Sequence, residues 1–248
     1  MKLSDFDYSL PKSLIAQYPL EKRDKSRLLI INRKTRSVEH KNFNNIIDYL
    51  NKGDLLILNN TKVILARLFG YRKNTGGKVE ILLQEQINNN RFKALINPLG
   101  KLKIGEEISI NNNGLSFRLI DFPNRIIEFN KKDILAKLEK IGHIPLPQYI
   151  KRQDSQIDKI RYQTVYAEHE GSIAAPTAGL HFTKSLLRKI RAKGVNIAFI
   201  TLHVGYGTFA PIRDENISNH RMHREYFQIP YDTVKLIRQT KKSGARVV

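Results

Sequence analysis

The stretch TKSLLRKIRAKGVNIAFITL, residues 183–202, predicts a helix followed directly by a buried strand. Thr183 is a favourable N-cap, and the apolar residues after it recur at a spacing that suits one helix face. Gly194 suits the helix C-terminus. The nearly continuous apolar run from Val195 to Leu202 is typical of a strand covered on both faces. This helix-then-strand order favours the α/β class.

Two loops that contain glycine and histidine flank this unit. Before it, GSIAAPTAGLHFT (171–183) brings His181 to the predicted helix start, where free amides favour anionic groups. After it, HVGYGTFAP (203–211) leaves the strand's carboxyl end, where open α/β sheets bind ligands. A tight structural turn with merely hydrogen-bonded histidines is the alternative interpretation.

Outward from this unit, the patterning changes twice. The apolar runs 28–31 and 55–58 predict buried strands. Residues 61–130 instead hold short predicted strands, separated by Asn, Gly and Pro turns, at 79–83, 92–96, 107–110, 115–120 and 125–129. A helix is predicted from Lys131 to Gly142. We therefore expect two domains of α/β (α+β) class: a discontinuous, sandwich-like α/β domain of residues 1–60 and 145–248, incomplete at its C-terminus, and a small β-barrel inserted as residues 61–144.

The chain has 248 residues and a formal net charge of +20. Such a surplus favours nucleic acid as a partner. Runs such as 88–90 and 111–113, all asparagine, indicate instead a genome rich in A and T, which inflates lysine regardless of function. The surplus is heaviest in residues 151–248, and the predicted helix 184–193 carries five cations and no acid.

Several classes of function are excluded by what the sequence lacks. There is no cysteine, which excludes disulfides and thiolate chemistry. We expect a cytoplasmic protein without a membrane segment, because no secretory signal or long apolar run occurs. His169-Glu170 lacks the second histidine of a zinc-protease motif, and Gly76-Gly77-Lys78 lacks the frame of a phosphate loop. No metal site is expected.

The histidine-bearing motifs also resemble a known family. AAPTAGLHFT (174–183), LHVGYGTFAPIR (202–213) and HRMHREY (220–226) are similar to the central motifs of the S-adenosylmethionine:tRNA ribosyltransferase-isomerases of queuosine biosynthesis. The similarity continues through DFDYSLPKSLIAQYPLEKRDKSRLL (5–29) and GDLLILNNTKVILARLFG (53–70), and covers essentially the whole chain. It implies the same two-domain arrangement.

The resemblance implies a specific reaction. Such an enzyme moves the ribosyl part of S-adenosylmethionine onto 7-aminomethyl-7-deazaguanine in a tRNA anticodon loop. It rearranges that group to an epoxycyclopentanediol, giving epoxyqueuosine, and releases adenine and methionine. S-adenosylmethionine is then a substrate, and neither a cofactor nor a metal is implied.

The candidate site residues follow from the resemblance and from loop position. His181 and His203 are the first catalytic candidates, since a neutral imidazole suits both removal of a proton beside sulfur and assistance to adenine departure. His223 and Glu225 are second candidates, with a polar network that braces the loop as the alternative. Candidate substrate-binding residues are Asn60, Thr61, Arg67, Glu80, Thr177, Gly179, Gly205, Gly207 and His220. A domain-interface ion pair for Arg67 and a solvent-facing strand position for Glu80 are the alternatives. Candidate RNA-binding residues are Lys184, Arg188 and Arg191.

Two alternatives to an active enzyme of this family are a remnant that only binds RNA and a methyltransferase. Members of the family continue past the position where this chain ends, shortly after a helix-ending glycine and the start of an apolar strand. We therefore expect a C-terminally truncated member, acting as a monomer or complemented by a separate C-terminal chain. A catalytically inactive remnant that retains basic RNA binding is the alternative. A generic S-adenosylmethionine-dependent methyltransferase is disfavoured, because no glycine-rich loop follows the first strand.

Overall fold

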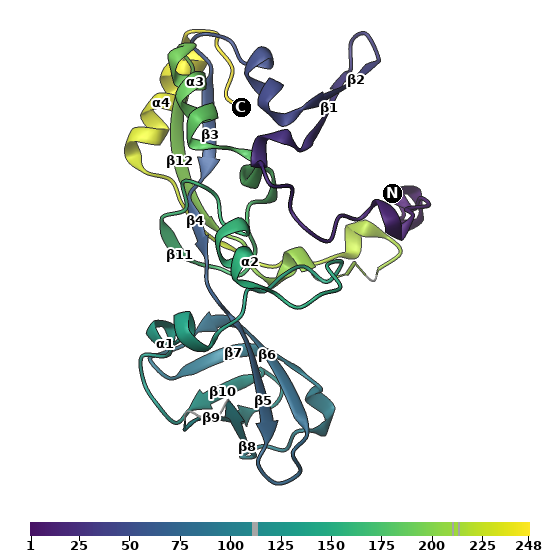
Figure 1. Ribbon diagram of the computed structural model, residues 1–248, viewed down its shortest axis with the longest axis vertical. Coiled ribbons are helices and arrows are strands. Elements are labelled where there is room, and N and C mark those ends of the chain that lie inside the picture. Colours follow the sequence, from purple (N-terminus) through teal and green to yellow (C-terminus); the bar gives the residue numbers. More distant parts are fainter. Residues whose placement is uncertain (111–113, 210, 213) are drawn as a thin grey trace. The chain divides into compact units, whose positions relative to one another are not determined.

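The computed structural model describes residues 1–110, 114–209, 211–212 and 214–248. These residues form two units: Met1–Val63 together with Gln148–Val248, and Ile64–Pro147. The chain crosses between the units after residues 63 and 147. The fold is mixed α/β with a closed barrel, as the sequence predicts (Figure 1).

The first unit is organised around a mixed sheet in the order β13-β12-β3. β3 (Leu55–Asn59) runs parallel to β12 (Asn196–His203), and β12 pairs antiparallel with β13 (Tyr226–Gln228). β3 also pairs with Val247. The expected strand after Gly194 is thus present, one residue later than predicted. A second, smaller sheet pairs β4 (Thr61–Val63) in parallel with β11 (His169–Ser172).

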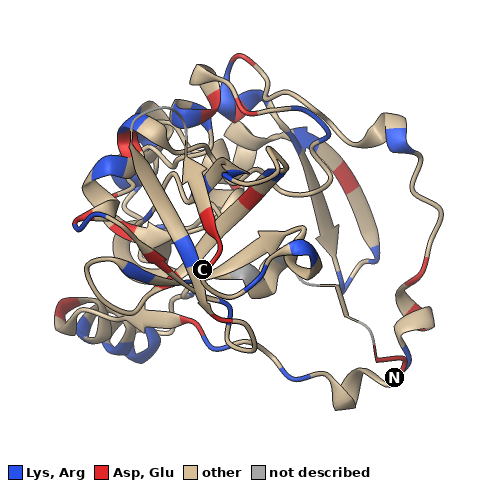
Figure 2. Cartoon of the chain, turned by 90° about the horizontal axis from the view of Figure 1, so that it is seen from below, with Lys and Arg blue, Asp and Glu red and all other residues tan. Residues whose placement is uncertain are grey.

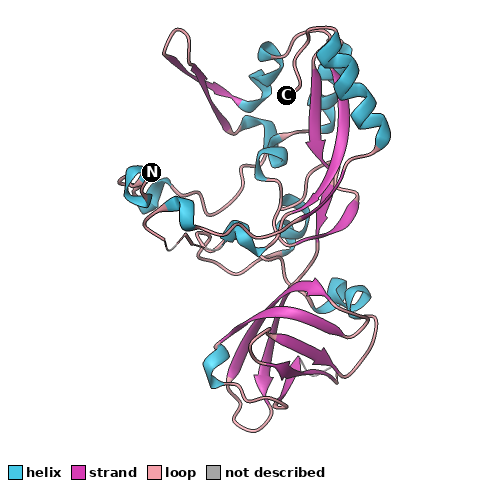
Figure 3. Cartoon of the chain, turned by 180° about the vertical axis from the view of Figure 1, so that it is seen from behind, coloured by secondary structure: helices cyan, strands magenta, loops and turns pink. Residues whose placement is uncertain are grey.

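Helices cover this sheet. α3 (Lys184–Ala192) begins as predicted, because Thr183 Oγ1 accepts a hydrogen bond from Leu186 N at 3.0 Å. Gly194, with a φ of +85°, ends it. The apolar face of α3 joins one core cluster: Phe43, Leu50, Leu56, Leu58, Phe182, Leu186, Leu187, Ile190 and Val195. α4 (Tyr231–Lys242) packs along β12 (Figure 3). Thr233 Oγ1 of this helix donates to Phe199 O at 2.8 Å.

The hairpin of β1 (Arg27–Asn32) and β2 (Ser37–Asn42) departs from the prediction. The run 28–31 was expected to be a buried strand, and that prediction is wrong. Leu29 and Ile31 are 54% and 62% exposed, because β1 pairs with β2 alone and only Leu28 reaches the core cluster. An apolar run reports strand propensity, whereas burial depends on what the rest of the chain places over it.

Six antiparallel strands close the barrel of the second unit in the order β10-β7-β6-β5-β8-β9. The strands are β5 (Arg67–Arg72), β6 (Lys78–Gln86), β7 (Arg91–Asn97), β8 (Glu107–Ile110), β9 (Leu115–Asp121) and β10 (Ile126–Phe129). The sequence predicts all of these except β5. Inward-facing residues such as Phe92, Phe117 and Phe129 are fully buried, as expected for a small filled barrel.

α1 (Ile134–Ile141) follows the barrel and ends at Gly142, as predicted. Its Ile134 and Leu138 are buried, whereas Leu135 is 39% exposed. The described residues form one more α-helix, α2 (Gln156–Arg161), and their other helical elements are short 3-10 turns. These span Leu3–Phe6, Lys12–Leu14, Arg23–Lys25, Phe43–Tyr49, Leu99–Lys101, Thr177–His181, Tyr206–Phe209 and Ile217–Asn219.

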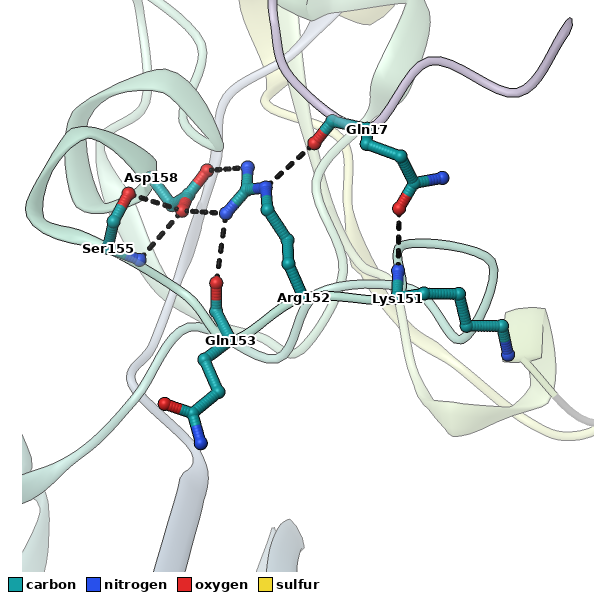
Figure 4. Close-up of polar contacts among 6 residues, drawn as sticks. All are labelled: Gln17, Lys151, Arg152, Gln153, Ser155 and Asp158. Carbon is teal, nitrogen blue, oxygen red and sulfur yellow. Dashed lines mark hydrogen bonds and ion pairs between the residues drawn. The ribbon is translucent and has the colours of Figure 1, made fainter. Parts of the chain in front are cut away.

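Within the first unit, Arg152 fastens the N-terminal segment to α2 (Figure 4). Its guanidinium donates to both carboxylate oxygens of Asp158, at 2.7 and 2.8 Å, and its Nε donates to Gln17 O at 2.7 Å. The Gln17 side chain in turn accepts from Lys151 N at 2.7 Å. The Arg152 guanidinium also lies 4.4 Å from the centroid of the Tyr18 ring. Residues 17 and 18 are therefore held by a charge-assisted network.

Within the described part of the chain, no helix has the length and apolar character needed to cross a bilayer. Lys and Arg are distributed along helices, strands and loops, and they outnumber the acidic residues (Figure 2).

Candidate active site

His203 lies at the carboxyl end of β12, where the strand passes into the 204–207 loop. Its Nδ1 is 2.7 Å from Oγ1 of Thr61, the first residue of β4. Thr61 is fully buried, so its hydroxyl is shielded from water, whereas His203 is only partly buried. Burial, and secondarily the nearby His169, lowers the pKa of His203. The imidazole is therefore neutral at neutral pH.

Two neighbours confine the His203 ring. Tyr226 of β13 stacks on it, with ring centroids 5.4 Å apart and planes 20° from parallel. Gly171 of β11 has a φ of +148°, and a Cβ at this position would lie 2.7 Å from His203 Nε2 and 2.9 Å from two ring carbons. Only glycine leaves room for the imidazole here. The ring is thus held by a stacking partner, a hydrogen bond and a close backbone.

Asn60 joins the strands around this histidine. It is buried, its Nδ2 donates to Glu168 Oε2 at 3.0 Å, and its Oδ1 accepts from Thr201 Oγ1 at 2.8 Å. Its backbone carbonyl accepts from Glu168 N at 2.8 Å. These bonds tie β4 and β12 to the segment before β11. Of the predicted substrate-binding residues, Asn60 and Thr61 therefore lie beside His203.

His181 occupies a separate setting at the end of the 3-10 helix Thr177–His181. It is half-buried, and its ring lies 5.2 Å from that of Phe43. Burial lowers its pKa, and the positive charge of Arg23 adds to this, whereas a hydrogen bond with the Arg23 backbone opposes it. Among the described residues, no hydrogen bond, ion pair or ring contact joins His181 to His203.

The other predicted residues of this turn differ in burial. Thr177 is exposed, while Gly179 is buried and packs against the Tyr166 hydroxyl so closely that a Cβ there would clash with it. Burial raises the pKa of Tyr166 to about 12. Tyr166 packs between Phe182 and Phe199, which makes it a core residue.

The second catalytic candidates, His223 and Glu225, lie against the loop that follows β12. Glu225 Oε1 accepts from Gly205 N at 2.8 Å. A Cβ at Gly207 would lie 2.9 Å from the His223 Cβ, so these two segments are in close contact. His220 is half-buried and its backbone N donates to Ile217 O. Glu225 and His223 thus make contacts that brace the loop.

Arg67 and Glu80 belong to the barrel unit, on β5 and β6. Arg67 Nε lies 3.1 Å from Glu80 Oε1, and an Nη of Arg67 donates to Leu146 O at 3.1 Å. The two side chains therefore form an ion pair inside one unit, and the ion pair proposed for Arg67 does not bridge the units.

Lys184, Arg188 and Arg191 are exposed along α3, opposite the buried residues Leu186 and Ile190. Their spacing places them on one face of the helix. Among the described residues, no group of three or more metal-ligating side chains converges on one point.

Tyr226, Gly171, Glu168 and Arg23 were not predicted as site residues. Tyr226 lies in a motif that the sequence singles out, and an aromatic residue three positions after His223 is a signal that could have drawn attention to it. Gly171 opens the small-residue loop, but only the structure shows which side chain it makes room for.

Comparison with known proteins identifies the family. The model of the queuosine biosynthesis protein family matches residues 3–248. The chain belongs to this family of tRNA-modification proteins.

Individual relatives are similar over the whole chain. The S-adenosylmethionine:tRNA ribosyltransferase-isomerase of Sulfurihydrogenibium sp. is 51% identical over 100% of this chain and 74% of its own length. The Staphylococcus haemolyticus protein of the same name is 49% identical over 100% of this chain and 73% of its own. The crystal structure of S-adenosylmethionine tRNA ribosyltransferase from Thermotoga maritima is 35% identical, with a TM-score of 0.43, over 98% of this chain and 68% of that one.

Proposed function

We propose that this chain is a tRNA-modifying transferase-isomerase. It transfers the ribosyl part of S-adenosylmethionine to 7-aminomethyl-7-deazaguanine in tRNA and rearranges it to give epoxyqueuosine. The observation that supports this most strongly is the 51% identity, over the full chain, to the protein of Sulfurihydrogenibium sp. that is named S-adenosylmethionine:tRNA ribosyltransferase-isomerase. The reaction takes place in the cytoplasm, where its tRNA substrate is found.

The chemistry requires groups that move or share protons without carrying a permanent charge. One group removes a proton beside the sulfonium sulfur, and another assists the departing adenine. His181 and His203 suit these tasks, because burial lowers the pKa of both and keeps them neutral. Asn60 and Thr61 hold the strands from which His203 projects. S-adenosylmethionine enters as a substrate.

The RNA part of the proposal rests on charge. Lys184, Arg188 and Arg191 form an exposed cationic stripe on α3, and such a stripe binds phosphates in a salt-dependent way. The target base lies in an unpaired loop, where it can be reached without opening a helix.

Nucleoside mass spectrometry tests the proposal. Precursor tRNA is incubated with S-adenosylmethionine and this chain, digested and analysed, beside a full-length family enzyme as positive control. We expect the epoxyqueuosine nucleoside in both reactions. Product in the control alone would contradict the proposed activity, and a product heavier by a single methyl group would indicate methyl transfer instead.

A further inference from the structure

The hydrogen bond between Thr61 and His203 has a direction that the surrounding burial determines. The Thr61 side chain is fully buried, and among the described residues its hydroxyl has one hydrogen-bond partner, His203 Nδ1 at 2.7 Å. A buried hydroxyl proton requires an acceptor. Nδ1 can accept that proton only when it carries no proton of its own.

The opposite direction leaves a polar group unsatisfied. If Nδ1–H donated to Oγ1, the threonine proton would have no acceptor in the described structure, at a site without water access. Leaving a buried donor unpaired costs free energy comparable to a lost hydrogen bond. The neutral tautomer with its proton on Nε2 is therefore favoured.

His203 is only partly buried, so a proton on Nε2 can be accepted by water or a substrate, unlike the proton of the fully buried Thr61 hydroxyl. Nε2 lies on the side of the ring that faces Gly171, and it has no hydrogen-bond partner among the described residues. The stacked Tyr226 fixes the ring plane, so the Nε2–H bond has a set direction. A donor held in this way stabilises charge that develops on a reacting group.

We propose that Thr61 is a positioning residue that fixes His203 in its Nε2–H tautomer, so that His203 serves the reaction as a hydrogen-bond donor and not as the base. This proposal concerns the same site as the proposed function. The tautomer stands by itself, whereas the role of His203 in the reaction rests on the proposed function. A neutral histidine that polarises its substrate has precedent in enzyme chemistry. The proton beside sulfur must then be taken by another group. His181, the other first catalytic candidate, is the histidine that remains for this role.

Nuclear magnetic resonance of the full chain labelled with ¹⁵N-histidine tests the tautomer directly. The His203 signals are assigned by their loss in His203→Gln. At a pH above the histidine titration, we expect Nδ1 to have the shift of an unprotonated nitrogen and Nε2 that of a protonated one. The reverse pattern would overturn the proposal. This result needs neither substrate, so it is separate from the failure of the proposed function.

Two substitutions of Thr61 test its role. Thr61→Val keeps the shape and removes the hydroxyl, so the His203 tautomer preference should weaken and kcat should fall about tenfold, with a smaller change in KM. Thr61→Ser restores the donor and should rescue both the spectrum and kcat. An unchanged His203 spectrum in Thr61→Val would show that Thr61 does not set the tautomer.

Substitution of the histidine itself tests the donor role. His203→Gln keeps an N–H donor near the position of Nε2, whereas His203→Leu removes it. We expect His203→Leu to lose about a hundredfold or more in kcat and His203→Gln to lose clearly less. Equal loss in the two variants would contradict the assignment of His203 as a donor.

Discussion

Arg246 donates hydrogen bonds to both carboxylate oxygens of Asp54, although the two residues are 192 positions apart. Asp54 is 2% exposed at the start of β3 and also accepts from Asn51 N at 2.7 Å. The Arg246 side chain is the largest cause that lowers the pKa of Asp54 to about 2. The pair links the turn before β3 to the backbone that pairs with β3 near Val247.

The Asp54–Arg246 pair should make part of the free energy of unfolding sensitive to acid. The folded-state pKa of Asp54 lies below the ordinary value of 3.8, so folding favours the carboxylate. Its contribution is complete above about pH 4 and is lost as the pH falls towards about 2. Asp54→Asn should lower the free energy of unfolding by about 1–3 kcal/mol at neutral pH and flatten its decline in acid. Urea unfolding across this range measures both, with the exposed Asp214→Asn as control. Equal pH profiles for the two variants would contradict the prediction.

The clamp at Arg152 predicts a local effect on the N-terminal segment. Lysine cannot reproduce the two-point contact with Asp158 together with the bond to Gln17 O. Arg152→Lys should therefore accelerate amide hydrogen exchange in residues 15–18 and lower the stability of the fold by about 1–3 kcal/mol. Mass-spectrometric exchange gives the local readout. Arg33→Lys, at an exposed turn position, should leave the exchange pattern as in the parent chain. If Arg152→Lys does the same, Arg152 does not fasten this segment.

Replacing Gly171 by alanine, which adds one methyl group, should severely disturb the position of the His203 ring. A Cβ would press on His203 Nε2 at 2.7 Å, and the φ of +148° is strained for alanine. Gly171→Ala should displace the His203 ring and reduce kcat by about tenfold or more, while far-UV circular dichroism stays unchanged. Gly100→Ala is the matched control, because a Cβ there meets nothing within 4 Å. Full activity in Gly171→Ala would show that the ring position does not matter.

The α3 stripe predicts salt-sensitive tRNA binding. Reversing Lys184, Arg188 and Arg191 to glutamate should weaken tRNA binding and lower the slope of log affinity against log salt by about 3. The same reversal of Lys235, Arg238 and Lys242, exposed on α4, changes the net charge equally and serves as control. Fluorescence anisotropy at several salt concentrations measures the slope. An equal loss in both triple variants would mean that overall charge, and not the α3 stripe, drives binding.

Much of the fold could be predicted because it is encoded locally. The helix 184–192 carries its own cap, its apolar spacing and its terminal glycine, and five barrel strands are separated by recognisable turns. β5 was missed because its polar ends, Arg67 and Arg72, obscure the alternation that its burial pattern shows. The exposed face of β1 was missed because local sequence does not show what covers a strand.

For the candidate site, the sequence indicates residue types and not contacts. His203, Thr61 and Asn60 lie in motifs that the sequence singles out, but the 2.7 Å contact between Thr61 and His203 spans 142 positions. No periodicity reports a pairing at that separation. The stacking of Tyr226 and the space left by Gly171 are likewise properties of the folded chain.

Isotope labelling of S-adenosylmethionine shows which of its groups is transferred to the tRNA. The chain is incubated with precursor tRNA and S-adenosylmethionine labelled with ¹³C either in its ribose or in its methyl group, and the digested nucleosides are weighed by mass spectrometry. We predict that the modified nucleoside gains the ribose label and none of the methyl label. Incorporation of the methyl label, or of neither label, would contradict the account.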